Sequence, residues 1–314
     1  MASDWKRNLK NNKVAYFFIY VGKYLVWRPL YRSARHLSIN LRTTTHCYST
    51  NGKRIIPLKN CKEGESCVIL GNGPSVRMED LSAIEKSGVD SFGANRIIDI
   101  FNKTEWRPTY MCVCDSSFLT GVNNTTTCDE YIDSIESFGI KYLFVADYLK
   151  HYFKKESNAL YYVDFYENAG YSANPHPFSE DAGVCVSELG TVTNFSIQLA
   201  VYMGYKKIYL YGMDNTYTRY FGDDGKFHIN NNVQSHVEGM KKNEIDEKAD
   251  MVPKSKFQAH YIGGFGDVRK ANIGYRMCRE YAESHGIEII NITRGGHLEA
   301  FDREAFDRVF KQVK

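Results

Sequence analysis

Several common signatures are missing from this sequence of 314 residues. Its eight cysteines form no Cys-x-x-Cys pair, which favours free, mostly buried thiols in a reducing compartment. No Asp-x-Asp occurs, although such a carboxylate pair is a common way to hold Mg²⁺ or Mn²⁺. The glycines match neither a P-loop nor a full Gly-x-Gly-x-x-Gly. An ordinary ATP or NAD site is therefore not favoured.

A long apolar run is also missing. Val14–Trp27 is apolar and aromatic except for Gly22 and Lys23, but fourteen residues fall short of the roughly 20 that span a bilayer. The segment lacks the small-residue cleavage site of a secretory signal. The sequence therefore indicates neither a membrane-spanning helix nor a signal peptide here.

Negative charge is scarce at the amino-terminal end. Residues 1–42 hold nine Lys and Arg against one acid, Asp4, so this segment carries +8. Because the whole chain carries +3, the remainder carries −5 and does not favour nucleic-acid binding. A basic, aromatic segment predicts a helix lying at the inner face of the cell membrane, on an otherwise cytoplasmic protein. The alternative is a helix that packs on its own domain or on a partner subunit.

The rest of the chain predicts an α/β fold. Residues 43–64 are polar and turn-rich and indicate a linker, with a strand near Arg54–Leu58. Residues 65–314 alternate short apolar runs with amphipathic helices, which predicts a single Rossmann-like, mostly parallel sheet flanked by helices, a GT-A-like variant. Strands are predicted at 67–70, 90–94, 110–114, 141–145, 207–211 and 287–292, and helices at 78–87, 96–101, 129–137, 193–203, 271–284 and 304–313. Residues 216–258 have no steady period and predict a lid.

The first strand and the turn after it organise this domain. Cys67–Leu70 is apolar, and Gly71-Asn-Gly-Pro-Ser75 follows before a predicted helix. Glycines permit positive φ and a close approach of ligand to backbone, and the amide groups at a helix start attract phosphate. The competing interpretation is a structural turn that binds nothing. Because ligands of such sheets lie beyond the carboxyl ends of the strands, Asn72, Asn95, Asp115 and Asp214 are the candidate ligand-binding side chains.

An ordered set of segments resembles the Campylobacter-type bacterial sialyltransferases and the related MptE-like domain family, named for an archaeal 6-hydroxymethylpterin diphosphokinase. The matching segments are Ile69–Ser75, Ala94-Asn95, Cys114-Asp-Ser116, Thr191-Val-Thr-Asn194, Ala200–Asp214 and His260-Tyr-Ile-Gly263. The resemblance covers about residues 66–295 and implies an inverting, metal-independent glycosyltransferase without a cofactor. Its co-substrate would be a CMP-activated acidic sugar, and its acceptor a surface glycan or glycolipid such as lipopolysaccharide.

The resemblance also implies site residues. His260 takes the place of the general base, and Tyr217 and Tyr220 are the nearest candidates for donors to the leaving phosphate. The nucleotide and donor would contact Gly71, Asn72, Gly73, Ser75, Asn95, Asp115, Ser116, Thr191, Thr193, Gly212 and Asp214. Val192 and Leu189 stand where the sialyltransferases carry a serine and an arginine that serve the sugar, so another CMP-linked acidic sugar such as Kdo fits as well.

The residues alone support parts of this chemistry. A neutral histidine can accept a proton from a sugar hydroxyl, and tyrosine hydroxyls can stabilise a leaving phosphate. His228, His236 and His297 are weaker candidates for the base. Two other functions remain open: an ATP-dependent diphosphokinase acting on a pterin-like alcohol, and a non-catalytic membrane-attached binding protein. The sequence leaves a homo-oligomer open too.

Overall fold

The computed structural model describes residues 21–115, 128–166, 177–215, 219–221, 227–229, 237–238 and 268–310. The chain divides into two units, Met1–Tyr48 and Ser49–Lys314. The predicted base His260, together with Tyr217 and Ser116, lies outside the described residues.

The first unit is helical where it is described. A π-helical stretch, η1 (Val21–Trp27), leads into α3 (Arg28–Thr45), which has proline in its first turn. The helix ends at His46, whose left-handed backbone lets its N–H bond the carbonyl of Arg42. Across the described ranges, no helix is long and apolar enough to cross a membrane.

The second unit is built on one eight-stranded sheet in which every neighbouring pair is parallel. Its order is β12 (Asp302–Arg303), β11 (Glu288–Asn291), β8 (Lys207–Tyr211), β1 (Ser66–Leu70), β2 (Asp90–Ala94), β3 (Tyr110–Val113), β4 (Tyr142–Ala146) and β5 (Leu160–Val163). The central strands are buried almost throughout, as continuous apolar runs require when both faces are covered. The predicted parallel α/β sheet is confirmed.

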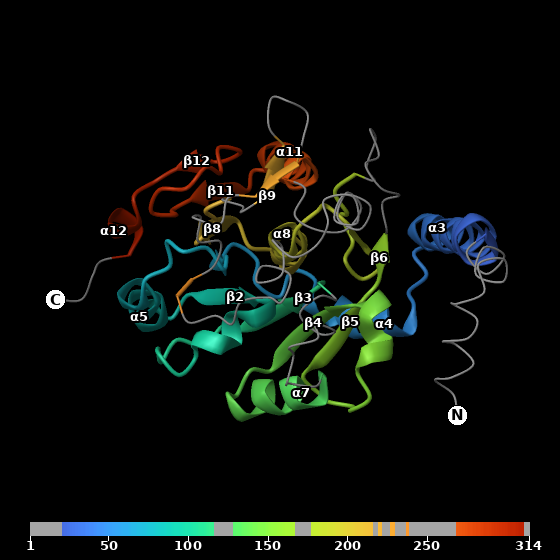
Figure 1. The fold of residues 1–314 in the computed structure, drawn as a ribbon, viewed down its shortest axis with the longest axis horizontal. Helices are drawn as coiled ribbons and strands as arrows, with labels where there is room; N and C mark the ends of the chain where they lie inside the picture. The colour runs from blue at the N-terminus through green and yellow to red at the C-terminus, as the bar shows by residue number, and fades with distance from the viewer. Residues whose placement is uncertain are drawn as a thin grey trace. The chain divides into compact units, whose positions relative to one another are not determined.

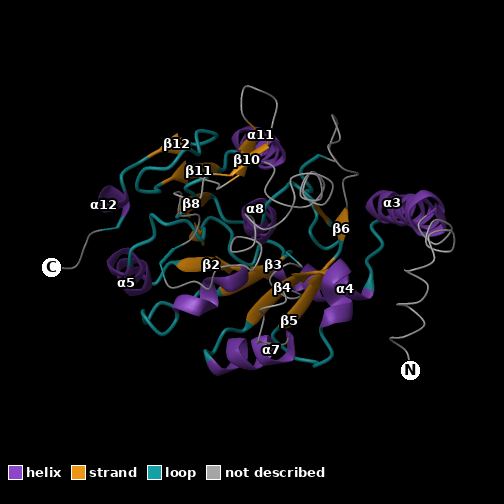
Figure 2. Cartoon of the chain, viewed as in Figure 1, coloured by secondary structure: helices purple, strands orange, loops and turns teal. Residues whose placement is uncertain are grey.

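Helices cover both faces of this sheet (Figures 1 and 2). From β1 the chain runs outward through β2, β3, β4 and β5, and it then returns to build β8, β11 and β12 on the other side of β1. Right-handed crossovers in opposite directions place helices on opposite faces. The helices are α5 (Met78–Ser87), α7 (Cys128–Ser137), α8 (Val192–Met203), α11 (Val268–Ser284) and the short α12 (Phe306–Val309), and the 3₁₀ turns are η3 (Asn95–Ile100) and η4 (Asp147–Tyr152).

Within the described residues, four short strands lie outside the main sheet. β6 (Phe165–Tyr166) pairs in parallel with β7 (Val186–Ser187), and β9 (Arg219–Phe221) pairs antiparallel with β10 (Phe227–Ile229). The second pair falls within the residues predicted to be a lid, where the sequence showed no strand. All eight cysteines are free, and five of them are buried.

Residues 49–64 are part of the second unit, and the strand predicted near Arg54–Leu58 is wrong. α4 (Thr50–Ile55) and the 3₁₀ turn η2 (Ile56–Leu58) occupy these residues. Ser49 caps α4, and its hydroxyl donates to Asp164 at 2.7 Å, as does the amide of Asn51. Because Asp164 is more than a hundred residues away, a contact distant in sequence selects the helix over the extended form that the apolar run suggested.

Candidate functional site

The site predicted from the strand ends lies where the sheet reverses its winding. β1 has β2 on one side and β8 on the other, so the chain leaves β1 in one direction and returns to it from the other. In open parallel sheets this switch point leaves a crevice beyond the carboxyl ends of the two strands. Asn72, Asn95, Asp115 and Asp214 follow the ends of β1, β2, β3 and β8.

The turn after β1 is fastened to the end of β8. The N–H of Gly71 donates to Tyr211 O at 2.7 Å, and the N–H of Gly73 donates to Gly212 O at 3.0 Å. The N–H and hydroxyl of Ser75 donate to the same carboxylate oxygen of Asp214, at 3.2 and 2.7 Å. Asp214, predicted as a nucleotide contact, therefore holds the turn in place.

The two turn glycines are required by close packing. The sequence suggested positive φ at Gly71 and Gly73, but neither adopts it. A Cβ at Gly71 would lie 2.3 Å from Gly212 O, and a Cβ at Gly73 would lie 1.8 Å from Asp214 Oδ2 and 2.5 Å from Gly212 O. Gly212 itself has φ +72°. The glycines thus let the ends of β1 and β8 approach closely.

We predict that Gly73→Ala distorts the turn after β1 and the end of β8 more than it distorts the rest of the fold. The added methyl group must push Asp214 away from Ser75, at a cost of about 1–3 kcal/mol for overpacking. Urea unfolding measures this loss, and nucleotide titration measures the site. Gly88→Ala is the control, because a Cβ there meets no described atom within 4 Å and costs only the strain of φ +69°. Equal effects of the two substitutions on ligand binding would contradict the packing explanation.

The turn offers few free amide groups to a phosphate. Besides Gly71, Gly73 and Ser75, the N–H of Val76 donates to Gly73 O and the N–H of Arg77 donates to the Tyr211 hydroxyl. The first turn of α5 also carries the acids Glu79 and Asp80. These acids disfavour a phosphate beside them, and phosphate binding by the amide groups at the start of α5 stays a prediction.

Three buried amide oxygens at this edge have no hydrogen-bond partner among the residues that the structure describes. They are Oδ1 of Asn72, Asn95 and Asn215. The Nδ2 of Asn72 donates to Ala94 O at 3.2 Å, which turns its Oδ1 away from that carbonyl, and the Nδ2 of Asn215 donates to Asn272 of α11. Buried acceptors without partners are costly, so three at one edge indicate a place for a ligand that brings donors.

The backbone adapts to hold two of these side chains. Asn95 and Asn215 have φ +48° and +52°, in the left-handed region that asparagine tolerates better than most residues. The Tyr131 hydroxyl fixes Asn95 by donating to its carbonyl at 2.7 Å. The sequence pointed to Asn95 but not to Asn215. The signal for Asn215 was its place directly after Asp214, as one more polar residue beyond the end of β8.

Thr191 and Thr193, which were predicted to contact the donor, form hydrogen bonds within the fold. Thr191 caps α8 by accepting from the N–H of Asn194, and the Thr193 hydroxyl donates to the sulfur of Met213 at 3.3 Å. Both contact the hydroxyl of Tyr275, and burial raises the pKa of that tyrosine. Asp115 lies two residues beyond β3 and is partly exposed. Donor contacts by these residues stay predictions.

The predicted lid touches the turn at one described point. Val237 is buried, and its N–H donates to the carbonyl of Asn72 at 2.8 Å. No pattern in the sequence pointed to this contact. Tyr220 is in β9, where the structure describes the backbone alone. Val237, one of the residues predicted to form the lid, therefore lies directly beside Asn72, whose amide oxygen is one of the three described above.

His297, one of the weaker candidates for the base, also lies at this edge. Its N–H donates to Asp214 O at 2.7 Å, and its side chain is exposed. Gly296 permits this approach, because a Cβ at that position would lie 2.8 Å from Asp214 Cα and 2.9 Å from Asp214 O. Within the described ranges, no three His, Cys, Asp or Glu side chains gather as a metal site.

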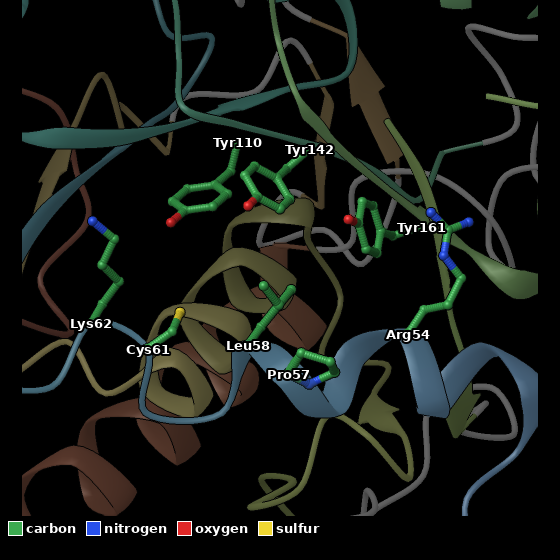
Figure 3. A pocket seen from close by; sticks show the side chains of 8 residues that line it. All are labelled: Arg54, Pro57, Leu58, Cys61, Lys62, Tyr110, Tyr142 and Tyr161. Carbon is green, nitrogen blue, oxygen red and sulfur yellow. The ribbon is translucent and has the colours of Figure 1, made fainter. Parts of the chain in front are cut away.

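A separate cavity of about 480 Å³ opens at the other end of the strands, where they begin (Figure 3). Tyr110, Tyr142 and Tyr161, from the starts of β3, β4 and β5, face Pro57 and Leu58 of η2 across it. It lies at the amino ends of the strands, so it is distinct from the site between β1 and β8.

The chain is similar to a known protein family and to a solved structure. A family model described as "6-hydroxymethylpterin diphosphokinase MptE-like" matches residues 41–220, which is more than half of the chain. Among solved structures, a MAf glycosyltransferase from Magnetospirillum magneticum AMB-1 is similar at 14% identity and a TM-score of 0.44. That match covers 84% of this chain but only 39% of the other. No curated protein matches the chain.

Proposed function

Because the chain belongs to the 6-hydroxymethylpterin diphosphokinase MptE-like family, we propose that it is a transferase that binds a nucleotide-activated substrate between β1 and β8. In the finer form of the proposal, it moves an acidic sugar from a CMP-sugar to a glycan or glycolipid acceptor, with inversion and without a metal. The ordered segments from Ile69 to Gly263 that resemble the bacterial sialyltransferases support this form.

The three amide oxygens of Asn72, Asn95 and Asn215 carry the proposal. Each can only accept a hydrogen bond, so its ligand partner must be a hydroxyl or an amino group. An ionised phosphate has no proton to donate, whereas ribose hydroxyls and the amino group of cytosine do. We therefore assign the nucleoside to these asparagines, and we assign the phosphate to donors in residues 216–267.

This assignment leaves distinct tasks for the residues near the lid. Tyr217 and Tyr220 would donate to the leaving phosphate and stabilise the charge that develops on it. His260 would accept the proton of the acceptor hydroxyl, which then attacks the sugar carbon directly and inverts it. The proton ends on the imidazole, and CMP leaves with the bonding electron pair.

A second candidate function is favoured by the family description itself. A diphosphokinase would bind ATP at the same edge and transfer a diphosphate to an alcohol. Such an enzyme needs carboxylates for magnesium, and Asp115 and Asp214 are the candidates. One oxygen of Asp214 already accepts two hydrogen bonds from Ser75, so this carboxylate is engaged in holding the turn.

Thermal unfolding with CMP or with ATP separates these functions. At a ligand concentration 100 times the dissociation constant, binding stabilises the folded chain by about 2.7 kcal/mol. We expect CMP to raise the melting temperature and ATP to leave it unchanged. The reverse result would favour the diphosphokinase, and no response to either would favour a non-catalytic binding protein. Release of CMP from a panel of CMP-sugars then identifies the donor.

The amide oxygen of Asn72 can be tested directly. We predict that Asn72→Leu, of similar volume, weakens CMP binding at least about tenfold, the loss expected when one buried hydrogen bond is removed. Asn102→Leu is the matched control, since Asn102 is exposed on the same unit. If Asn72→Leu remains folded and binds CMP as tightly as the control does, the assignment of the nucleoside is wrong.

A further inference from the structure

Exposed large hydrophobic side chains are concentrated on one helix. Among the described residues seven are exposed, and six of these lie between Val26 and Leu41. We call five of them the apolar stripe: Trp27 (67% exposed), Leu30 (63%), Tyr31 (50%), Leu37 (61%) and Leu41 (56%). Contiguous apolar surface of this kind marks an interaction surface.

The stripe follows one side of the helix. Steps of three, four and seven residues return to the same face at 3.6 residues per turn, so the five positions line up from the end of η1 along α3. Ile39 points away from this face and is fully buried. The buried Ile39 and the exposed tryptophan, tyrosine and leucines therefore lie on different sides of α3.

The charge of the segment indicates which partner covers the stripe. Residues 1–42 carry nine Lys and Arg and one acid, whereas the remaining chain carries a net −5. A second copy that paired its stripe with this one would bring the same +8 and be repelled. An anionic bilayer brings negative charge, an apolar interior for leucine and a headgroup layer for tryptophan and tyrosine.

We propose that α3 docks on an anionic membrane surface, with the apolar stripe at the boundary between headgroups and acyl chains. The net positive charge of residues 1–42 then attracts the anionic headgroups. The stripe belongs to the first unit and the site after β1 and β8 to the second, so the inference goes beyond the proposed transfer reaction and does not depend on it. It would bring the enzyme to a membrane leaflet that exposes anionic headgroups.

Vesicle sedimentation of the full chain tests this docking. We expect binding to vesicles of phosphatidylcholine with phosphatidylglycerol, weaker binding to phosphatidylcholine alone, and release by high salt. The triple variant Leu30→Ser/Leu37→Ser/Leu41→Ser should lose at least about tenfold in partitioning, because three apolar side chains no longer enter the bilayer. Phe138→Ser, at the one exposed large hydrophobic residue of the described set that lies outside Val26–Leu41, should bind vesicles like the unchanged chain.

Two results would overturn the proposal. One is binding of the triple variant equal to that of Phe138→Ser, with both variants folded by circular dichroism. The other is a lack of vesicle binding by the unchanged chain while sedimentation equilibrium shows a dimer that the triple variant loses, since the stripe would then join two copies. Nucleotide binding should be the same in all these variants, so failure of membrane docking is distinguishable from failure of the proposed function.

Discussion

Replacing Asp80 with alanine is expected to lower the free energy of unfolding by about 3–5 kcal/mol, the usual cost of removing one partner from a buried ion pair. Asp80 is fully buried in α5. Its carboxylate accepts from Arg294 at 2.7 and 3.0 Å and from the Tyr211 hydroxyl at 2.5 Å. The substitution removes the buried acceptor that the partly exposed Arg294 guanidinium and the Tyr211 phenol share.

Urea unfolding of Asp80→Ala and Asp307→Ala gives the comparison. Asp307 pairs with the same Arg294, at 2.6 and 2.9 Å, but is exposed, so its loss should lower the free energy of unfolding far less than the loss of Asp80 does. The hydrogen bonds from Arg294 hold the pKa of Asp307 below its ordinary value, so its stabilisation is present at neutral pH and is lost as the pH falls through that lowered pKa. Similar losses of unfolding free energy in the two variants would show that the burial of Asp80 does not set the cost of removing it.

His260→Ala is expected to reduce kcat by about 10²–10⁴ while CMP binding stays nearly intact. The reason is chemical: in the proposed reaction a sugar hydroxyl attacks poorly until a base accepts its proton. The rate of the unchanged enzyme should fall as the pH is lowered, because an imidazole with an ordinary pKa of about 6.5 then becomes protonated. Single-turnover rates across the acid and neutral pH range with a CMP-sugar would measure both effects.

His297→Ala is the companion variant. The backbone N–H of His297 binds Asp214 O, and that bond survives the substitution. If His260 is the base, His297→Ala should keep most of the rate and the same pH profile. A large loss in His297→Ala together with a near-normal His260→Ala would transfer the role of base to His297. Loss of CMP binding in His260→Ala would show instead that His260 serves the nucleotide.

The sequence predicted the framework of the fold because that framework rests on local patterns. Cys67–Leu70 and Lys207–Tyr211 are apolar runs bounded by turn residues, and the structure has strands there. α5 spans Met78–Ser87, as predicted. Leu160–Val163 gave too short a run, and β5 was missed. The last helix was predicted over 304–313, but α12 spans only Phe306–Val309 within the described residues.

The sequence selected candidate residues by their position after strands, and their binding of a ligand stays a prediction. The rule that ligands lie beyond parallel strands identified Asn72, Asn95 and Asp214. It could not show that Asp214 binds Ser75, or that the turn glycines pack against β8, because both facts depend on contacts about 140 residues apart. Asn215 and Val237 were missed for the same reason. Hydrogen bonding across the sheet, rather than any local motif, determines which polar atoms remain for a ligand.

The hydrogen bond from Val237 to Asn72 divides the chain between β8 and α11 into two spans, residues 216–236 and 239–267. Each span has its own anchored ends, and the entropy of closing a loop changes only slowly with its length. Insertions in one span therefore need not shift the other. In the proposed reaction Tyr217 and Tyr220 belong to the first span and His260 to the second. The proposed donors to the leaving phosphate and the proposed base would thus lie, along the chain, on opposite sides of this one hydrogen bond.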